Sequence, residues 1–194
     1  MKYSNQVNLN LSKEEILNKS INYHVQGDIS QAAEYYQLFL DKGFSDPNVL
    51  SNYGVICFEK GEIEKAERLY RESIKSFPSF PQSYSNLANL LLTVGYPKDG
   101  EVFARHAVQL LPENADANSN LGIILKELGN LVEAEAYTKK ALELNPKLVL
   151  ALNNLATIKL ALGDLKEAES IVRKSIELAP DFHDGYRNLG NILR

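Results

Sequence analysis

One spacing constrains this chain more than any other feature: a glycine recurs every 34 residues through most of its 194 residues. The glycines are Gly27, Gly61, Gly95, Gly129 and Gly163. Prolines keep the same step, at Pro78, Pro112, Pro146 and Pro180. A fixed period of about 20–50 residues indicates supersecondary units that stack on their neighbours, so the chain is expected to form an array of repeats.

Each repeat has the pattern of two helices, which we call helix A and helix B. Before Gly129, apolar residues recur at steps of three and four: Leu121, Ile124, Leu125 and Leu128. After it, a second apolar face follows: Leu131, Ala134, Tyr137, Ala141, Leu142 and Leu144. The glycine between them supplies the left-handed backbone that ends helix A, and the proline near the end of the unit cannot continue helix B. The fold class is therefore predicted to be all-α.

Small residues stand at one position of each helix. In helix A they are Gly54, Ala88, Gly122, Ala156 and Gly190, and in helix B they are Ala32, Ala66, Gly100, Ala134 and Ala168. Small side chains let the two backbones of a hairpin approach closely.

This combination resembles the tetratricopeptide repeat family, in which a small residue of helix A, a turn glycine, a small residue of helix B and a closing proline share one unit. The resemblance implies a right-handed superhelical α-solenoid of about 11 helices. Residues 1–12 then form a lead-in, and the array occupies 13–194, in units 13–46, 47–80, 81–114, 115–148 and 149–182 with a partial sixth unit, 183–194. The chain departs from the family pattern where Asn118 replaces a bulky residue, where Pro97 replaces an apolar residue, and in the first unit, which lacks the closing proline.

Both ends of the array carry signals of their own. Ser12 and Glu15 match a capping box at the start of the first helix. Lys19 and Ser20 stand where later units have an apolar and a small residue, which predicts a terminal repeat that faces water. At the other end no helix B follows the last helix A, so its face of Tyr186, Leu189, Gly190 and Leu193 is expected to be partly bare. We expect weak homo-oligomerisation through this C-terminal helix.

By resemblance to the family, a partner would lie in the concave groove lined by positions 2, 5, 6, 9, 12 and 13 of helix A. Position 6 is always asparagine: Asn18, Asn52, Asn86, Asn120, Asn154 and Asn188. The other candidate groove residues are Ser51, Ser85, Ser119 and Asn153 at position 5 and Val55, Phe58, Asn89, Leu92, Ile123 and Lys126 at positions 9 and 12. Amides both donate and accept hydrogen bonds, so a ladder of them can hold a peptide backbone. This ladder is similar to that of the repeat domain in O-linked N-acetylglucosamine transferases. The alternative is that these asparagines tie adjacent helices together.

Charge and composition exclude several other functions. The net charge of −4 is spread along the chain, so no basic face attracts nucleic acid. No segment has the length of apolar sequence that crosses a membrane or directs export, and the single Cys57 cannot form an internal disulfide, so a cytoplasmic location is expected. The three histidines have no partner at metal-ligand spacing, and no catalytic motif or cofactor site is present in the sequence.

The sequence therefore predicts a non-enzymatic scaffold that binds an extended peptide or a partner protein. Two alternatives stay open. The repeats could be the substrate-recruiting arm of a longer enzyme, such as a glycosyltransferase or another group transferase, or they could form a self-assembly module.

Overall fold

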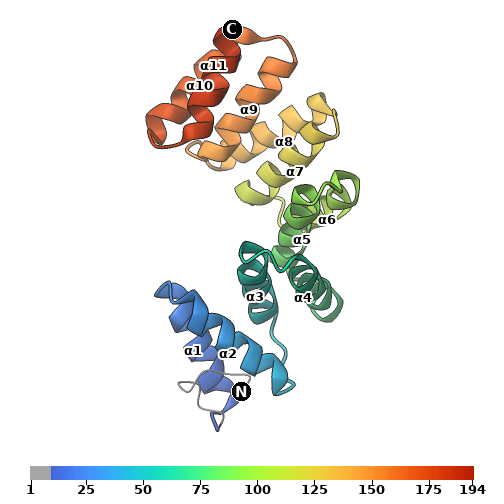
Figure 1. Ribbon diagram of the computed structural model, residues 1–194. Helices are drawn as coiled ribbons and strands as arrows, with labels where there is room; N and C mark the ends of the chain where they lie inside the picture. Colours follow the sequence, from blue (N-terminus) through green and yellow to red (C-terminus); the bar gives the residue numbers. More distant parts are fainter. Residues whose placement is uncertain (1–9) are drawn as a thin grey trace. The chain divides into compact units, whose positions relative to one another are not determined.

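The computed structural model describes residues 10–194, and these hold eleven α-helices and no strand (Figure 1). The helices are α1 (Lys13–Val25), α2 (Ile29–Asp41), α3 (Pro47–Glu59), α4 (Ile63–Ser76), α5 (Pro81–Thr93), α6 (Pro97–Leu110), α7 (Ala115–Glu127), α8 (Leu131–Leu144), α9 (Val149–Ala161), α10 (Leu165–Leu178) and α11 (His183–Leu193). Odd-numbered helices are helix A and even-numbered ones helix B. The predicted all-α solenoid of helical hairpins is confirmed.

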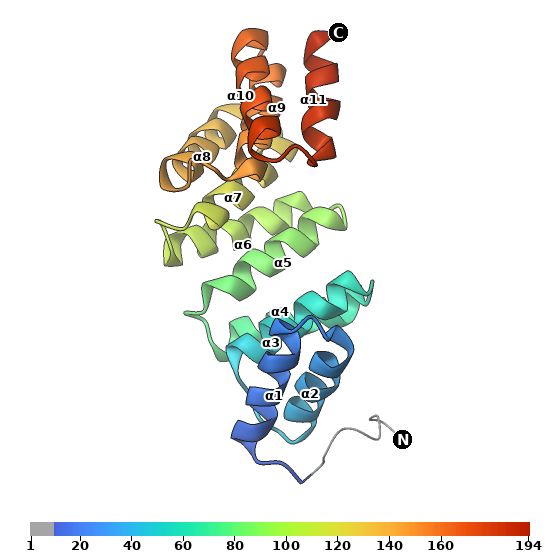
Figure 2. The same cartoon turned by 90° about the vertical axis from the view of Figure 1, so that its left-hand side faces the viewer.

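The chain divides into two compact units, Met1–Leu90 and Leu91–Arg194, with the boundary inside α5. In the first unit α1 packs on α2 and α3 on α4, and in the second α7 packs on α8 and α9 on α10. The last helix, α11, lies beside α9 and α10, as Figure 2 shows. No helix among the described residues is both long and apolar enough to cross a bilayer.

The turn glycines do what their spacing predicts. All five have a positive φ, between 77° and 87°. Around Gly27 the amide of Asp28 donates to the carbonyl of Tyr23, and the amide of Gly27 donates to that of His24. This pair of bonds satisfies the last carbonyls of helix A and recurs at the other four turns. In the first repeat, residues 13–46, Gly43 ends α2 in the same way, with a φ of 77°, so this repeat needs no closing proline.

Other local predictions have mixed outcomes. The Ser12–Glu15 capping box is present, and Pro97 opens α6 at its first turn. Asn118 is buried and donates to the carbonyls of Pro112 and Asn114, so it replaces the usual bulky residue by fastening the loop before α7. The expectation that Ser20 faces water is wrong: Ser20 is fully buried, and it occupies the position at which Gly54 and Gly122 meet helix B of their hairpins.

The close approach of helices A and B is tightest at the small residue of helix A. A Cβ atom on Gly122 would lie 2.3 Å from Oγ1 of Thr138 in α8. On Gly54 it would lie 2.3 Å from the ring of Tyr70 in α4. Gly190 occupies the equivalent place in α11, and no described residue lies within 4 Å of its added Cβ. The glycine is therefore required only where a helix B covers it.

This difference gives a matched pair of variants. Gly122→Ala should lower the free energy of unfolding by about 1–3 kcal/mol, because the new methyl group overpacks the contact with Thr138. Gly190→Ala should leave it unchanged or raise it by up to about 1 kcal/mol, because alanine is the better helix former. Urea denaturation of both variants checks this, and equal effects would contradict it.

Candidate peptide-binding groove

A hollow of about 440 Å³ lies in the second unit, over three successive A helices. It is lined by Ile123 and Lys126 of α7, by Leu150, Asn153, Asn154 and Thr157 of α9, by Phe182 of the following loop, and by Asp184, Arg187, Asn188 and Asn191 of α11. We call this hollow the α9 groove.

The repeat explains why these residues meet. Because α9 packs against both α7 and α11, residues that are 34 apart in sequence stand side by side on the three helices. Ile123, Thr157 and Asn191 form one such row, and Asn154 and Asn188 form another. Five of the sequence-predicted groove residues line this hollow: Ile123, Lys126, Asn153, Asn154 and Asn188.

Two of the asparagines bond to the preceding helix A. Asn188 Nδ2 donates to Asn153 Oδ1 at 2.8 Å. In the first unit Asn86 Nδ2 donates to Ser51 Oγ at 2.9 Å, the same step of 35 residues. The amide at position 6 thus holds the side chain at position 5 of the unit before it.

Two more asparagines bond to the preceding helix B. Asn52 Nδ2 lies 3.4 Å from Tyr36 Oη, and Asn154 Nδ2 lies 3.1 Å from Thr138 Oγ1. The side-chain oxygen of Asn154, Oδ1, is buried and has no hydrogen-bond partner among the described residues. Four of the six asparagines therefore tie neighbouring helices, as the alternative interpretation of the sequence has it.

The predicted groove residues differ in how much surface they offer. Asn18 is exposed, and Asn52, Asn86 and Asn120 are partly exposed, as are Val55, Phe58, Ser85, Asn89, Leu92, Ile123, Lys126 and Asn153. Ser51 and Ser119 are buried, at 1% and 3% exposure, so they belong to the packing between helices. Asn154 and Asn188 are also almost covered, at 4% and 6%.

Several lining residues were not among those predicted. Leu150, Asp184 and Arg187 occupy positions 2 and 5 of their units, and Thr157 and Asn191 occupy position 9, so their register was a usable signal. Phe182 lies before α11, outside helix A, and no register marks it. Its contribution could be found only from the packed structure.

The groove surface is amide-rich and mixed in charge. Arg187 pairs with Asp184 at 3.0 Å, and Lys126 lies 3.8 Å from Glu127, with most of the four side chains well exposed. Leu150 is 57% exposed, which places an apolar side chain on the wall beside these polar groups. Within residues 10–194 no group of three or more His, Cys, Asp and Glu side chains could hold a metal ion. The arrangement suits non-covalent contact with another chain.

The roles of the asparagines can be separated by substitution. Asn86→Ala should lower the free energy of unfolding by about 0.5–1.5 kcal/mol, since it removes the bond to the buried Ser51 hydroxyl. Asn120 makes no side-chain hydrogen bond to the described residues, so Asn120→Ala should change stability little. Thermal and urea unfolding of the two single variants checks this, and a larger loss from Asn120→Ala would contradict the assignment.

Comparison with known proteins agrees with this architecture. Among curated proteins, no sequence matches the chain. Solved structures that resemble it include a thermophilic TPR protein, TTC0263, of Thermus thermophilus, with 21% identity, a TM-score of 0.75 and coverage of 94% of this chain and 99% of that one. MamA from Desulfovibrio magneticus RS-1 has 20% identity and a TM-score of 0.74 over 88% of this chain and 96% of its own. YrrB, described as a TPR protein with an unusual peptide-binding site, has 18% identity and a TM-score of 0.69 over 89% of each chain.

Two segments of the sequence, residues 20–93 and 113–181, match the profiles of the tetratricopeptide repeat. Together they cover most of the chain, and the turns, hairpins and small-residue contacts described above lie in the register that this repeat requires. The chain belongs to the tetratricopeptide repeat family.

Proposed function

We propose that this protein is a non-enzymatic scaffold whose α9 groove binds an extended segment of a partner protein. Tetratricopeptide repeat proteins in general mediate protein–protein interactions, and the related fold of YrrB is described with a peptide-binding site. The observation that carries the proposal is the hollow over α7, α9 and α11, where amides, an exposed leucine and two cations are gathered on one surface.

An extended backbone fits this surface because it presents a donor and an acceptor at every residue. Asn191 is exposed and Asn153 is partly exposed, so their amides can meet such groups. Leu150 offers contact to an apolar side chain, and Lys126 and Arg187 to an acidic one. Recognition would therefore combine backbone contacts with a preference for apolar and acidic side chains.

Screening of a peptide array, followed by titration of the best peptide, tests the proposal. Leu150→Asp should weaken binding about tenfold or more, because an apolar contact of leucine size contributes about 1.5–3 kcal/mol when fully buried. Leu165→Asp is the matched control, since Leu165 is 51% exposed on α10 and does not line the groove. Both variants should fold as the parent does. Equal losses in the two variants, or no loss in Leu150→Asp, would contradict the proposal.

An asparagine ladder would favour the alternative role as the recruiting arm of a longer transferase. Four of the six asparagines donate a side-chain N–H to another residue of the array. Only Asn18 and Asn120 make no side-chain hydrogen bond, by either the nitrogen or the oxygen, to the described residues. The asparagines therefore support a general scaffold better than a backbone-gripping ladder.

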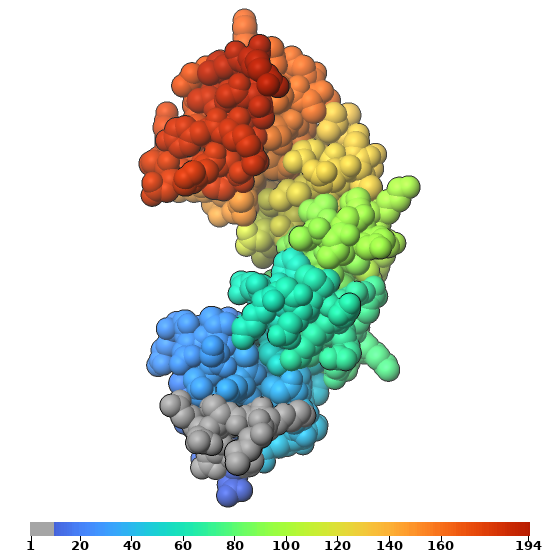
Figure 3. Space-filling view, viewed as in Figure 1, coloured from blue at the N-terminus to red at the C-terminus, as the bar shows by residue number. Residues whose placement is uncertain are grey.

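A second proposal concerns self-association through α11. Tyr186 and Leu193 are 51% and 59% exposed, whereas Ile192 is buried against α9 and α10 and anchors the helix. In Figure 3 the red surface at the C-terminal end faces the viewer with no other segment over it. Three members of the face that a helix B would cover, Tyr186, Gly190 and Leu193, are thus exposed, and a second copy of the chain could cover them.

Sedimentation velocity over a range of concentrations tests this. Tyr186→Glu combined with Leu193→Glu should abolish a concentration-dependent rise in sedimentation coefficient, because two charges would enter the contact. Leu189 is left in place because it packs partly against the core of the last hairpin. The control is Val102→Glu with Val132→Glu, on exposed apolar residues of α6 and α8. A parent protein that stays monomeric at high concentration would refute the proposal.

A further inference from the structure

In the second unit, ion pairs bridge each B helix to the next one. We call the boundary between two successive B helices a seam. Arg105 of α6 donates to both carboxylate oxygens of Glu133 in α8, at 2.8 Å each. Between α8 and α10, Lys159 lies 2.8 Å from Glu135 and 2.8 Å from Glu167 and is only 9% exposed. The hydrogen bonds to Glu135 and Glu167 hold the pKa of Lys159 above its ordinary value. In both seams a cation meets carboxylates from neighbouring helices.

The first repeat, residues 13–46, departs from this pattern. In each of the four later repeats, helix B carries a glutamate followed four residues later by a basic residue: Glu67 with Arg71, Glu101 with Arg105, Glu135 with Lys139, and Glu169 with Arg173. In α2 the same two positions are Ala33 and Gln37. In α4, the place that corresponds to Glu133 and Glu167 is taken by Lys65. Compared with the seam between α6 and α8, the seam between α2 and α4 therefore has two carboxylates fewer, and its cation, Lys65, lies on α4 instead of α2.

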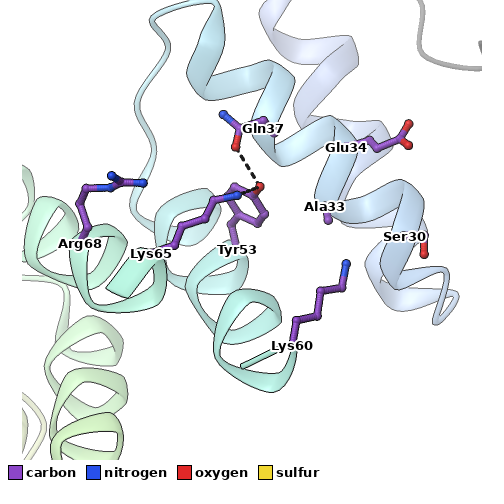
Figure 4. A pocket seen from close by; sticks show the side chains of 8 residues that line it. All are labelled: Ser30, Ala33, Glu34, Gln37, Tyr53, Lys60, Lys65 and Arg68. Carbon is purple, nitrogen blue, oxygen red and sulfur yellow. Dashed lines mark hydrogen bonds between the residues drawn. The ribbon is translucent and has the colours of Figure 1, made fainter. Parts of the chain in front are cut away.

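An open pocket of about 660 Å³ lies along this seam, shown in Figure 4. Three cationic side chains line it: Lys60 from the end of α3, and Lys65 and Arg68 one turn apart on α4. On the α2 side the pocket is lined by the short side chains of Ser30 and Ala33, and Tyr53 of α3 lies between α2 and α4. One carboxylate, that of Glu34, is among the lining residues, and it points away from the three cations.

Two of the three cations of this pocket have no carboxylate partner among the described residues, and the third, Lys65, has a long ion pair. Lys65 donates to Tyr53 Oη, and Tyr53 in turn donates to Gln37 Oε1 at 2.9 Å, so the hydrogen-bond partners of Lys65 across this seam are neutral groups. The nearest carboxylate oxygen to Lys65 belongs to Glu62, at 3.6 Å. Lys60 and Arg68 make no ion pair within residues 10–194.

We propose that the pocket between α2 and α4 is a second binding site, which takes an acidic segment of a partner protein. The segment's carboxylates would meet Lys60 and Arg68 as Glu135 and Glu167 meet Lys159 in the second unit. Arginine suits this role because its guanidinium binds a carboxylate through two parallel hydrogen bonds. The site lies in the first unit and shares no residue with the α9 groove, so it goes beyond the function proposed above.

Fluorescence anisotropy with labelled hexaglutamate as the probe tests the site, at about 50 mM salt to limit screening. Lys60→Gln combined with Arg68→Gln should weaken binding about tenfold or more, because two charge-assisted hydrogen-bond donors are lost. The control is Lys166→Gln with Lys174→Gln, which removes the same charge from exposed positions of α10. Equal weakening in the two double variants would show attraction to net charge only and would overturn the site. A short single-stranded oligonucleotide that binds the same residues more tightly than hexaglutamate would overturn the assignment to carboxylates.

A second variant fills the site from within. Ala33→Glu restores the carboxylate that the later units carry, and it should abolish hexaglutamate binding while leaving the melting temperature unchanged or slightly raised. Ser170→Glu adds the same charge at an exposed position of α10 and should have no such effect. Undiminished binding by Ala33→Glu would contradict the proposal. Leu150→Asp should not change hexaglutamate binding, so failure of this site and failure of the α9 groove can be told apart.

Discussion

Close contact between the two helices of a hairpin is the constraint on which the rest of this structure depends. Only a residue with little or no side chain fits where Gly122 meets Thr138 or where Gly54 meets Tyr70. That contact fixes how the two helices of a hairpin lie, and the neighbouring hairpin then packs on the surface they form together. The α9 groove is a product of this geometry, since it requires α7, α9 and α11 to lie side by side.

Much of the fold could be predicted from the sequence because its determinants are local and repeated. The turn glycines, the helix bounds that they set and the capping box at Ser12 each depend on residues within about one helical turn of one another. Ser20 was predicted wrongly because its position was interpreted as terminal, whereas the equivalent positions in other hairpins, Gly54 and Gly122, face helix B of the same hairpin.

The site was less predictable, because its chemistry depends on which side chains pair across helices. The repeat placed Asn154 and Asn188 correctly on the A helices, yet the sequence could not show that their amide protons are directed to Thr138 and Asn153. Phe182 enters the groove from a loop. The pocket between α2 and α4 was missed for a related reason. Ala33 and Lys65 stand where later repeats have glutamates, and this difference becomes meaningful only once α2 and α4 are known to flank the same pocket.

The turn between helices A and B has a consequence for how such a chain can change in length. The backbone hydrogen bonds of the turn around Gly27 join residues between Asn22 and Ile29, so the joint does not depend on how many units stand before or after it. Duplication or loss of one 34-residue unit in the middle of the array would leave all other joints unchanged. What would change is the number of A helices in the array, and with it the length of the surface that they present. The joint thus separates the local geometry of each hairpin from the length of this surface, which evolution can adjust one unit at a time.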